Sequence, residues 1–239
     1  MANENQFTGK AEFYSGRPLY PQECIDYLIN KLELTNDSVI ADIGAGTGIL
    51  TKAFLDVGYN VYAVEPNDDM FLELQNNLSG YSNAKLLQAT AENTNILTNA
   101  CDAVVVGTAF HWFDKEKFRT ECKRILKGHK YVAILRIGNN TDADKELDKK
   151  RGYTEQDLQS AKEFFGDGFV EHVCFEYFQV FNEERFIKNL LSSATAPLPC
   201  DAGFDDYVQK CKDTFDKHFG NKNANLPFAV NCFVGRLDI

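Results

Sequence analysis

The sequence predicts an α/β protein with a mostly parallel sheet and helices on both faces. Three observations predict it. A β-branched stretch at 39–43 is followed by a glycine turn and then by apolar residues at helical spacing. A second strand pattern that begins at Asn60 ends in the acidic residue Glu65, and the apolar run that begins at Cys101 indicates a fully buried strand. Strands that alternate with helices in this way form parallel sheets.

Composition excludes several classes of protein. With 239 residues and 44% hydrophobic content, the chain can bury a full core as one domain, 1–239. A net charge of −10 and a pI near 4.9 argue against a nucleic-acid partner. The N-terminus is polar, no stretch reaches membrane-spanning length, and seven scattered cysteines without a C-x-x-C pair indicate free thiols rather than disulfides or a metal site. We therefore expect a cytoplasmic protein that binds neither nucleic acid nor a membrane; its oligomeric state is unknown.

The central motif is the glycine turn, which contains Asp42, Gly44, Gly46 and Gly48 at alternate positions. Neither Gly44 nor Gly46 begins a complete G-x-G-x-x-G dinucleotide fingerprint, and a P-loop would need a following Lys-Ser/Thr. The pattern resembles the first motif of class I S-adenosylmethionine (SAM)-dependent methyltransferases. That resemblance implies close backbone contact, including Ala45, with the aminoacyl and ribose parts of SAM. An aspartate here suits the cationic sulfonium and ammonium groups.

An acidic residue ends the second strand. Glu65 lies 19 residues beyond Gly46, where a carboxylate accepts the ribose hydroxyls of an adenosine ligand. Pro66 follows and belongs to the same predicted cofactor site. Enzymes that use NAD share this device, so a nicotinamide-dependent oxidoreductase stays open as an alternative, as does a non-catalytic SAM-binding protein.

The N-terminal segment carries the pattern Tyr14-x-x-Arg17-Pro-x-Tyr-Pro. It is similar to the N-terminal flap of methyltransferases that have a type-11 methyltransferase domain. In that group, the resemblance implies, Tyr14 and Arg17 face the methionine carboxylate of the cofactor, and an arginine fork suits a carboxylate. The alternative is a surface arginine beside a proline turn.

The segment 85–94 is predicted to be a third strand that runs into a loop. In the family this loop lies against the adenine ring, so the resemblance implies a backbone contact at Ala91 and a polar contact at Glu92. Many members have Asp where this chain has Thr90, a departure that shifts the polar role to Glu92 or to the backbone. A loop carboxylate beside a helix start is the alternative for Glu92.

The end of the 101–107 strand is the place where ligands bind in doubly wound sheets. Gly107 and Thr108 are therefore predicted to contact the cofactor, and Phe110, His111 and Trp112 the substrate. The aromatic stretch resembles a subgroup that contains trans-aconitate-type carboxylate O-methyltransferases. Nucleic-acid amino-methyltransferases carry an Asn/Asp-Pro-Pro-aromatic motif at this point, which this sequence lacks.

His111 is the candidate catalytic residue, with alternatives. It is either a general base, because a histidine pKa lies near neutral pH, or a group that orients substrate or bonds the backbone under a lid. Methyl transfer to a carboxylate needs no base. Trp112 is either a wall of the substrate pocket or part of the core.

The resemblance covers nearly the whole chain and implies a Rossmann-like, seven-stranded, mostly parallel sheet with an antiparallel last strand and a helical lid. The predicted core is 34–138 with 172–181 and 226–236, and the predicted lid is 1–30, 139–171 and 182–225. The implied function is SAM-dependent methylation of a small-molecule acceptor, with O- or carboxylate methylation favoured.

Overall fold

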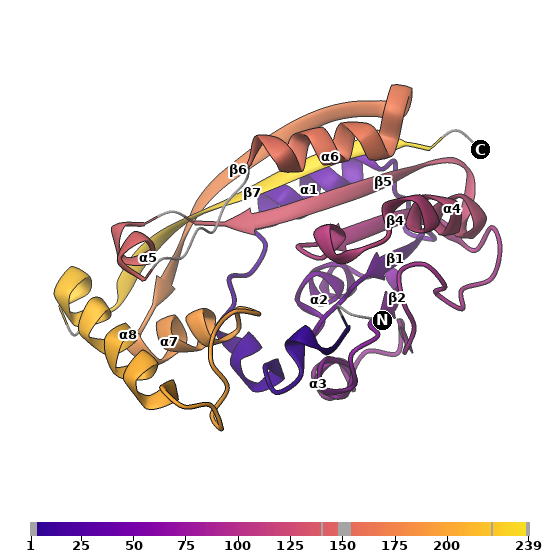
Figure 1. Ribbon diagram of the computed structural model, residues 1–239. Coiled ribbons are helices and arrows are strands. Elements are labelled where there is room, and N and C mark those ends of the chain that lie inside the picture. Colours follow the sequence, from indigo (N-terminus) through magenta and orange to yellow (C-terminus); the bar gives the residue numbers. More distant parts are fainter. Residues whose placement is uncertain (1–3, 140, 148–153, 221, 238–239) are drawn as a thin grey trace.

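The computed structural model describes residues 4–139, 141–147, 154–220 and 222–237. A seven-stranded sheet in the order β3-β2-β1-β4-β5-β7-β6 forms its centre (Figure 1). The strands are β1 (Val39–Ile43), β2 (Asn60–Val64), β3 (Ala84–Leu87), β4 (Cys101–Gly107), β5 (Leu126–Gly138), β6 (Phe169–Phe181) and β7 (Ala224–Arg236). Strand β7 pairs antiparallel with both neighbours, and every other pairing is parallel. The predicted sheet with one reversed strand is confirmed.

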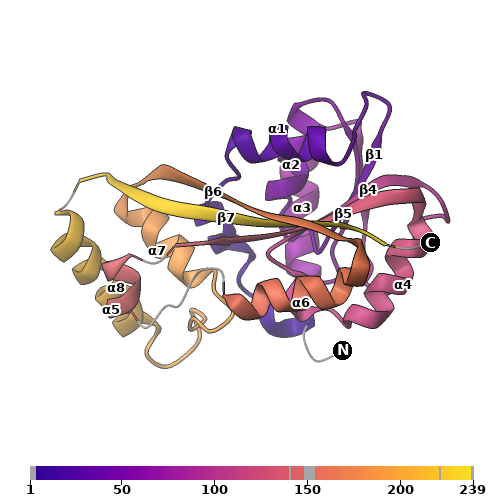
Figure 2. The same ribbon diagram turned by 90° about the horizontal axis from the view of Figure 1, so that it is seen from above.

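Helices cover both faces of the sheet (Figure 2). One face carries α1 (Gln22–Lys31), α2 (Ile49–Asp56) and α3 (Asp68–Leu78); the other carries α4 (Lys115–Ile125) and α6 (Glu155–Phe165). The remaining elements are α5 (Asp142–Glu146), α7 (Glu183–Leu191), α8 (Phe204–Phe219) and the 3₁₀ turns η1 (Glu4–Phe7), η2 (Ala11–Gly16), η3 (Phe110–Trp112) and η4 (Gly166–Gly168). In the described part of the chain, no helix has the length and apolar character needed to cross a bilayer.

The two faces of the sheet bury separate cores because successive strand residues point in opposite directions. In β4, Ala103 and Val105 pack under α1, α2 and α3, whereas Val104 and Val106 pack under α4 and α6. All four are fully buried, and removing a valine side chain from water contributes about 1.5–3 kcal/mol. The uninterrupted apolar run in the sequence therefore reflects burial on both faces.

Two side chains cap helices at the carboxyl edge of the sheet. Asn67 precedes α3, and its Oδ1 accepts the amide of Met70 at 3.1 Å. Asp114 precedes α4, and its Oδ1 accepts the amide of Lys117 at 3.2 Å. These caps satisfy amides that have no partner inside the helix, and they fix where each helix leaves the carboxyl edge of the sheet.

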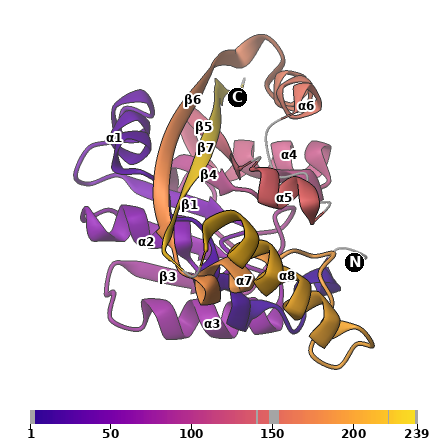
Figure 3. The ribbon, with the colours of Figure 1, turned by 90° about the vertical axis from the view of Figure 1, so that its left-hand side faces the viewer.

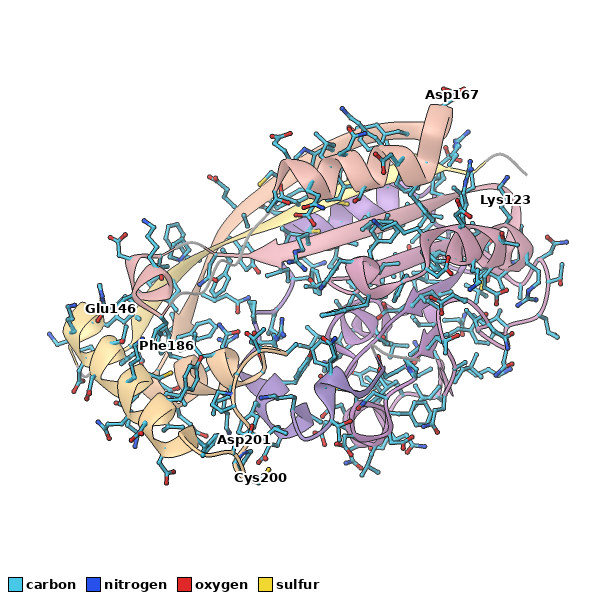
Figure 4. All side chains as sticks on the ribbon, in the orientation of Figure 1. Lys123, Glu146, Asp167, Phe186, Cys200 and Asp201 are labelled. Atoms are coloured by element: carbon cyan, nitrogen blue, oxygen red, sulfur yellow. The ribbon has the colours of Figure 1, made fainter. Side chains whose placement is uncertain are left out.

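Helices α5, α7 and α8 form a lid at the end of an extension of the same sheet. Strands β5, β6 and β7 have 13 residues each and reach beyond the core to α5, α7 and α8 (Figures 1 and 3). A third hydrophobic cluster holds these elements together, with Phe186 of α7 packed against Phe215 and Phe219 of α8 (Figure 4). The lid therefore has its own core and covers the carboxyl ends of the central strands.

The N-terminal segment joins the lid to the central domain. The 3₁₀ turn η2 packs so closely on α7 that a Cβ on Gly16 would lie 2.4 Å from the amide nitrogen of Asn189. Lys10 is buried, and its Nζ donates to the carbonyls of Ala196 (2.5 Å) and Pro197 (3.0 Å). On the other side, the amide of Gly9 donates to Oδ2 of Asp69 in α3, at 2.7 Å.

The lid is smaller than the sequence predicted. Helix α1 lies within the predicted lid segment 1–30, yet its apolar face packs against the sheet through Cys24, Ile25 and Leu28. Helix α6 lies within 139–171 and packs on the opposite face through Phe165 and its apolar neighbours. Both assignments are corrected because each helix has an apolar stripe that the sheet buries. The part of 139–171 at 140 and 148–153 lies outside the described residues.

Close packing between β7 and α6 gives a test of the fold. A Cβ on Gly235 would lie 2.4 Å from the ring of buried Phe165 and 2.9 Å from the carbonyl oxygen of Gly168. We expect Gly235→Ala to lower the free energy of unfolding by about 1–3 kcal/mol, because the buried ring must move. Gly80→Ala is the matched control, since its new methyl group would have no described neighbour within 4 Å, and it should change that free energy by less than about 0.5 kcal/mol. Urea denaturation measures both; equal effects would contradict this packing.

Candidate active site

A cavity of about 1000 Å³ lies between the carboxyl ends of the central strands and the lid. Its walls bring together residues that are far apart in the sequence. The predicted site residues that line it are Tyr14, Arg17, Asp42, Gly44, Ala45, Gly46, Glu65, Pro66, Ala91, Glu92, Gly107, Thr108, His111 and Trp112. The site therefore lies where the strand order reverses between β1 and β4, the usual ligand position in doubly wound sheets.

Two predicted site residues do not line the cavity. Gly48 is the N-cap of α2 with φ +90°, and a Cβ there would lie 2.8 Å from the side chain of Leu74. Its role is to let α2 approach α3. Phe110 is 7% exposed and packs edge-on against Phe118 and Phe164, so it belongs to the core under α4 and α6 rather than to a substrate pocket.

The amides of the glycine loop are already hydrogen-bonded within the protein. Those of Gly44 and Ala45 both donate to the carbonyl of Val64, at 2.9 and 3.0 Å. The amide of Gly46 donates to Oε2 of Glu65 at 2.8 Å. A loop that binds a diphosphate instead presents its free amides to the anion. These three amides are therefore not available to an anion.

Glu65 connects the end of β2 to this loop. It is 8% exposed; its Oε2 accepts the Gly46 amide and its Oε1 accepts the amide of Asn67 at 3.0 Å. Burial raises the pKa of Glu65, and the two amides oppose that shift. Each carboxylate oxygen has a second lone pair, and the side chain lines the cavity, so it can accept further hydrogen bonds from a ligand hydroxyl.

Asp42 is the most unusual group in the cavity wall. It is 1% exposed; its Oδ2 accepts the hydroxyl of Thr51 at 2.6 Å, but its Oδ1 has no hydrogen-bond partner among the described residues. Burial raises the pKa of Asp42 to about 7, against the effect of the Thr51 hydroxyl. A buried acceptor without a partner is costly, and a cationic ligand group would offset that cost.

The donor and acceptor set of this end of the cavity fits the predicted cofactor. Asp42 and Glu65 supply carboxylates, and the amides of Gly44, Ala45 and Gly46 are already hydrogen-bonded within the protein. Such a site favours a ligand with a positive charge and ribose hydroxyls over one with a diphosphate.

Arg17 and Tyr14 line the cavity from the N-terminal segment. The guanidinium of Arg17 lies 4.7 Å from the centre of the Tyr14 ring. Its Nε donates to the hydroxyl of Ser192 at 2.7 Å, and its Nη2 donates to the Ser192 carbonyl at 3.0 Å. Of the two alternatives for Arg17, the structure supports a place in the site, because the side chain is half-buried and lines the cavity.

Glu92 takes a structural role as well as a place in the wall. Its Oε1 accepts the amide of Asp114 at 2.9 Å, so it supports the start of α4, as the alternative interpretation proposed. Ala91 beside it is 5% exposed and lines the cavity.

Gly107 and Thr108 form a constrained turn at the end of β4. A Cβ on Gly107 would lie 2.5 Å from the hydroxyl of Tyr20, so only glycine fits. Thr108 has φ +58°, a strained conformation for a β-branched residue, and its Oγ1 accepts the amide of Ile137 at 3.2 Å. Strain of this kind persists where the surrounding structure enforces it, as at ligand sites.

His111 contacts Arg136, which the sequence analysis did not assign. Nη1 of Arg136 lies 3.2 Å from Nδ1 of His111, and because arginine only donates, Nδ1 accepts. Desolvation and then the charge of Arg136 lower the pKa of His111 to about 4, although the ring is exposed on its cavity side. The ring is thus neutral at pH 7 with its proton on Nε2, which makes it a donor toward the cavity and opposes a general-base role.

Trp112 is a wall of the cavity rather than core. Its ring centre lies 5.7 Å from that of Phe7, edge to face, and 4.6 Å from that of His111. It therefore joins the N-terminal segment to the end of β4 across the site.

Sequence reasoning missed several lining residues. Tyr20 belongs to the quoted N-terminal pattern, and Arg136 lies at the carboxyl end of a predicted strand. The sequence position of each could therefore have predicted its place in the cavity wall. No pattern in the sequence predicts the lining residues that the lid contributes, because only the folded lid brings them to the site: Asn189, Ser193, Ala194, Thr195 and Phe228.

The sheet order, the helices on both faces and the position of the cavity define the Rossmann-like fold of class I methyltransferases. Residues 41–134, less than half of the chain, match the model of a methyltransferase domain family. This segment contains the glycine loop, Glu65 and the aromatic stretch after β4.

Known proteins agree with that class. An uncharacterized methyltransferase of Mycobacterium tuberculosis (strain H37Rv) is 37% identical over 112 residues, 47% of this chain and 43% of that protein. The chain therefore matches less than half the length of that relative. An Arabidopsis thaliana ribosomal RNA small subunit methyltransferase is 33% identical over 101 residues, 40% of this chain and 29% of that protein.

Solved structures share the fold over nearly the whole chain. One, from Anaeromyxobacter dehalogenans and assigned as a type II methyltransferase, has a TM-score of 0.67 at 16% identity and covers 93% of this chain and 99% of that chain. An N-methyltransferase of Haemonchus contortus, solved with phosphomonomethylethanolamine and S-adenosylhomocysteine, has a TM-score of 0.58 at 16% identity, with 100% of this chain and 59% of that chain covered.

The raised pKa of Asp42 predicts a pH dependence of stability. Between its ordinary value of 3.8 and about 7 the native state binds more protons than the unfolded chain, so the free energy of unfolding should fall as pH rises through this window. We expect Asp42→Asn to reduce that slope by up to about 1.4 kcal/mol per pH unit, measured by urea denaturation from pH 4.5 to 7.5.

A second variant, at Thr51, tests the same pKa shift of Asp42 in the opposite direction. Thr51→Val removes the hydroxyl that donates to Oδ2 and opposes the shift, so the decline should extend to higher pH. Equal slopes in the wild type and in Asp42→Asn would show that the Asp42 carboxyl titrates normally.

Proposed function

We propose that this chain is a SAM-dependent methyltransferase that acts on a small-molecule acceptor, with transfer to oxygen and most readily to a carboxylate oxygen. One observation carries the proposal. The carboxylate of Asp42, whose buried Oδ1 lacks a partner within the described chain, belongs to the wall of a cavity in which the amides of Gly44, Ala45 and Gly46 are already hydrogen-bonded. A positively charged adenosine ligand meets both conditions, and a dinucleotide meets neither.

The protein's own residues would hold SAM at three points. Glu65 would accept the ribose hydroxyls, the wall near Ala91 would lie against the adenine, and Arg17 would donate to the methionine carboxylate. Asp42 would offset the positive charge at the other side of the ligand. When bound, SAM supplies a methyl group whose bond to sulfur breaks, with the electron pair left on sulfur, as the acceptor oxygen forms its new bond.

Catalysis at such a site is mainly positioning. An oriented approach lowers the barrier by about 7–11 kcal/mol, and the lid keeps water from the reacting atoms. A carboxylate oxygen carries no proton to remove, which agrees with a neutral His111 that donates from Nε2. We therefore assign His111 to orienting the acceptor rather than to proton abstraction.

The size and enclosure of the cavity support a small acceptor. Ligand pockets usually measure about 300–1,000 Å³, and this cavity of about 1000 Å³ has room for two small ligands side by side.

The net charge of −10 disfavours a ribosomal RNA substrate of the kind that the name of one partial relative indicates. The phosphomonomethylethanolamine in the Haemonchus complex makes nitrogen the alternative methylated atom.

Two other functions predict different results. A nicotinamide-dependent oxidoreductase would bind NADH through the same adenosine half-site. A non-catalytic SAM-binding protein would bind the cofactor and transfer no methyl group to any of a panel of carboxylic acids and amines when methyl-labelled SAM is supplied.

Ligand-dependent stability tests the cofactor assignment. S-Adenosylhomocysteine at about 100 times its dissociation constant should raise the free energy of unfolding by about 2.7 kcal/mol, and NADH should not. We expect Glu65→Gln to weaken binding by about 10–100-fold, because the amide replaces one acceptor oxygen with a donor.

Glu116→Gln, an exposed position on α4, is the matched control and should leave the affinity unchanged. Calorimetric titration measures both variants. Stabilisation by NADH and not by S-adenosylhomocysteine would replace the proposal with the oxidoreductase.

A further inference from the structure

Arg136 places a positive charge in the cavity wall. It lies on β5 one residue beyond Leu135, which pairs with Gly107, so its level in the sheet is that of Thr108. The side chain is half-buried and lines the cavity. Among the residues that the structure describes, no carboxylate lies within ion-pair distance of its guanidinium.

The hydrogen bonds of Arg136 leave donors to spare. Its Nη1 donates to Nδ1 of His111, a neutral acceptor, and its Nε is buried with no hydrogen-bond partner in the part of the chain that is described. Desolvation lowers the pKa of Arg136; the charge of Asp157 opposes that shift, and the charge of Arg17 adds to it. Asp157 itself is engaged in the capping box of α6, where its Oδ2 accepts from Thr154.

The position of Arg136 separates it from the cofactor end of the cavity. Glu65 ends β2 and Asp42 lies in β1, whereas Arg136 lies on β5, two strands beyond β1 in the sheet. The two acidic residues and Arg136 therefore lie on different strands of the cavity wall. Arg17 is already assigned to the cofactor carboxylate, which leaves Arg136 for the other ligand.

We propose that Arg136, with the Nε2–H of His111, binds a carboxylate of the methyl acceptor and makes the site specific for anionic acceptors. This proposal rests on the proposed function. The bound carboxylate is not the group that is methylated, because a close ion pair with arginine would stabilise the oxygen in the ground state and reduce its reactivity. The acceptor thus carries a second nucleophilic group, as a dicarboxylate does. A planar guanidinium matches the two oxygens of a carboxylate.

The test uses the full chain saturated with S-adenosylhomocysteine and a series of probes. The probes are propionate, phenylacetate, succinate and glutarate, each compared with its neutral amide at equal ionic strength, by thermal shift and calorimetric titration. At least one carboxylate should bind at least about 10-fold more tightly than its amide. Arg136→Met should remove that preference, and Arg136→Lys should restore part of it.

Controls separate binding from folding. Lys123→Met removes one positive charge at the end of α4 remote from the lid (Figure 4), and should keep the preference. Arg136→Met without ligand should be no less stable than the wild type, because it removes a desolvated charge and keeps an apolar stem. S-Adenosylhomocysteine should bind both variants with wild-type affinity.

The outcomes are distinct. If S-adenosylhomocysteine fails to bind the wild type, the proposed function fails. If it binds, but every carboxylate equals its amide or Arg136→Met keeps the preference, the acceptor-binding role of Arg136 is overturned and the proposed function stands.

Discussion

The carboxylate of Glu65 is the interaction on which the site depends. It lies at the end of β2 and accepts an amide of the glycine loop after β1, so it fixes the loop relative to the sheet. The amides of Gly44 and Ala45 in the same loop donate to the carbonyl of Val64, and Asp42 and Glu65 on either side of the loop line the cavity. These contacts favour a cationic over an anionic ligand without any contribution from the lid residues.

The second half of the cavity depends on the length of three strands. Because β5, β6 and β7 continue past the central domain, the lid and the sheet share one hydrogen-bonded ladder. Arg136 lies near the point where β5 leaves the core, with acidic groups on the β1–β2 side and the lid beyond it. One sheet therefore carries a negative wall for one ligand and a positive wall for another.

The sequence was most informative where structure is local. The glycine loop after β1 and Glu65 at the end of β2 each follow from neighbours within a few residues, and both lie where they were predicted. The extent of the lid was overestimated, because the apolar stripe of a helix does not say which surface will bury it. Phe110 shows the same limit, since an aromatic residue at a strand end fits a pocket wall and a core equally well.

The remaining features of the candidate site depend on tertiary contacts. The pairing of His111 with Arg136 joins the end of β4 to β5 and, of the roles left open for the histidine, favours a hydrogen-bond donor over a general base. No spacing in the sequence signals that contact. The carboxyl-edge rule for parallel strands points to Arg136, but only the structure shows that no carboxylate among the described residues pairs with its charge.

The buried ammonium of Lys10 bears on how ligands enter and leave. The lid is continuous with the sheet, so the N-terminal segment is the wall that can separate without breaking strands. Lys10 closes that wall on two uncharged carbonyls, and burial lowers its pKa against the opposing charge of Asp201. If the N-terminal segment separated from the lid, water would solvate the Lys10 ammonium again. That hydration would offset part of the free energy lost with the broken contacts. Separation of the N-terminal segment from the lid would therefore cost less free energy than the buried surface alone implies.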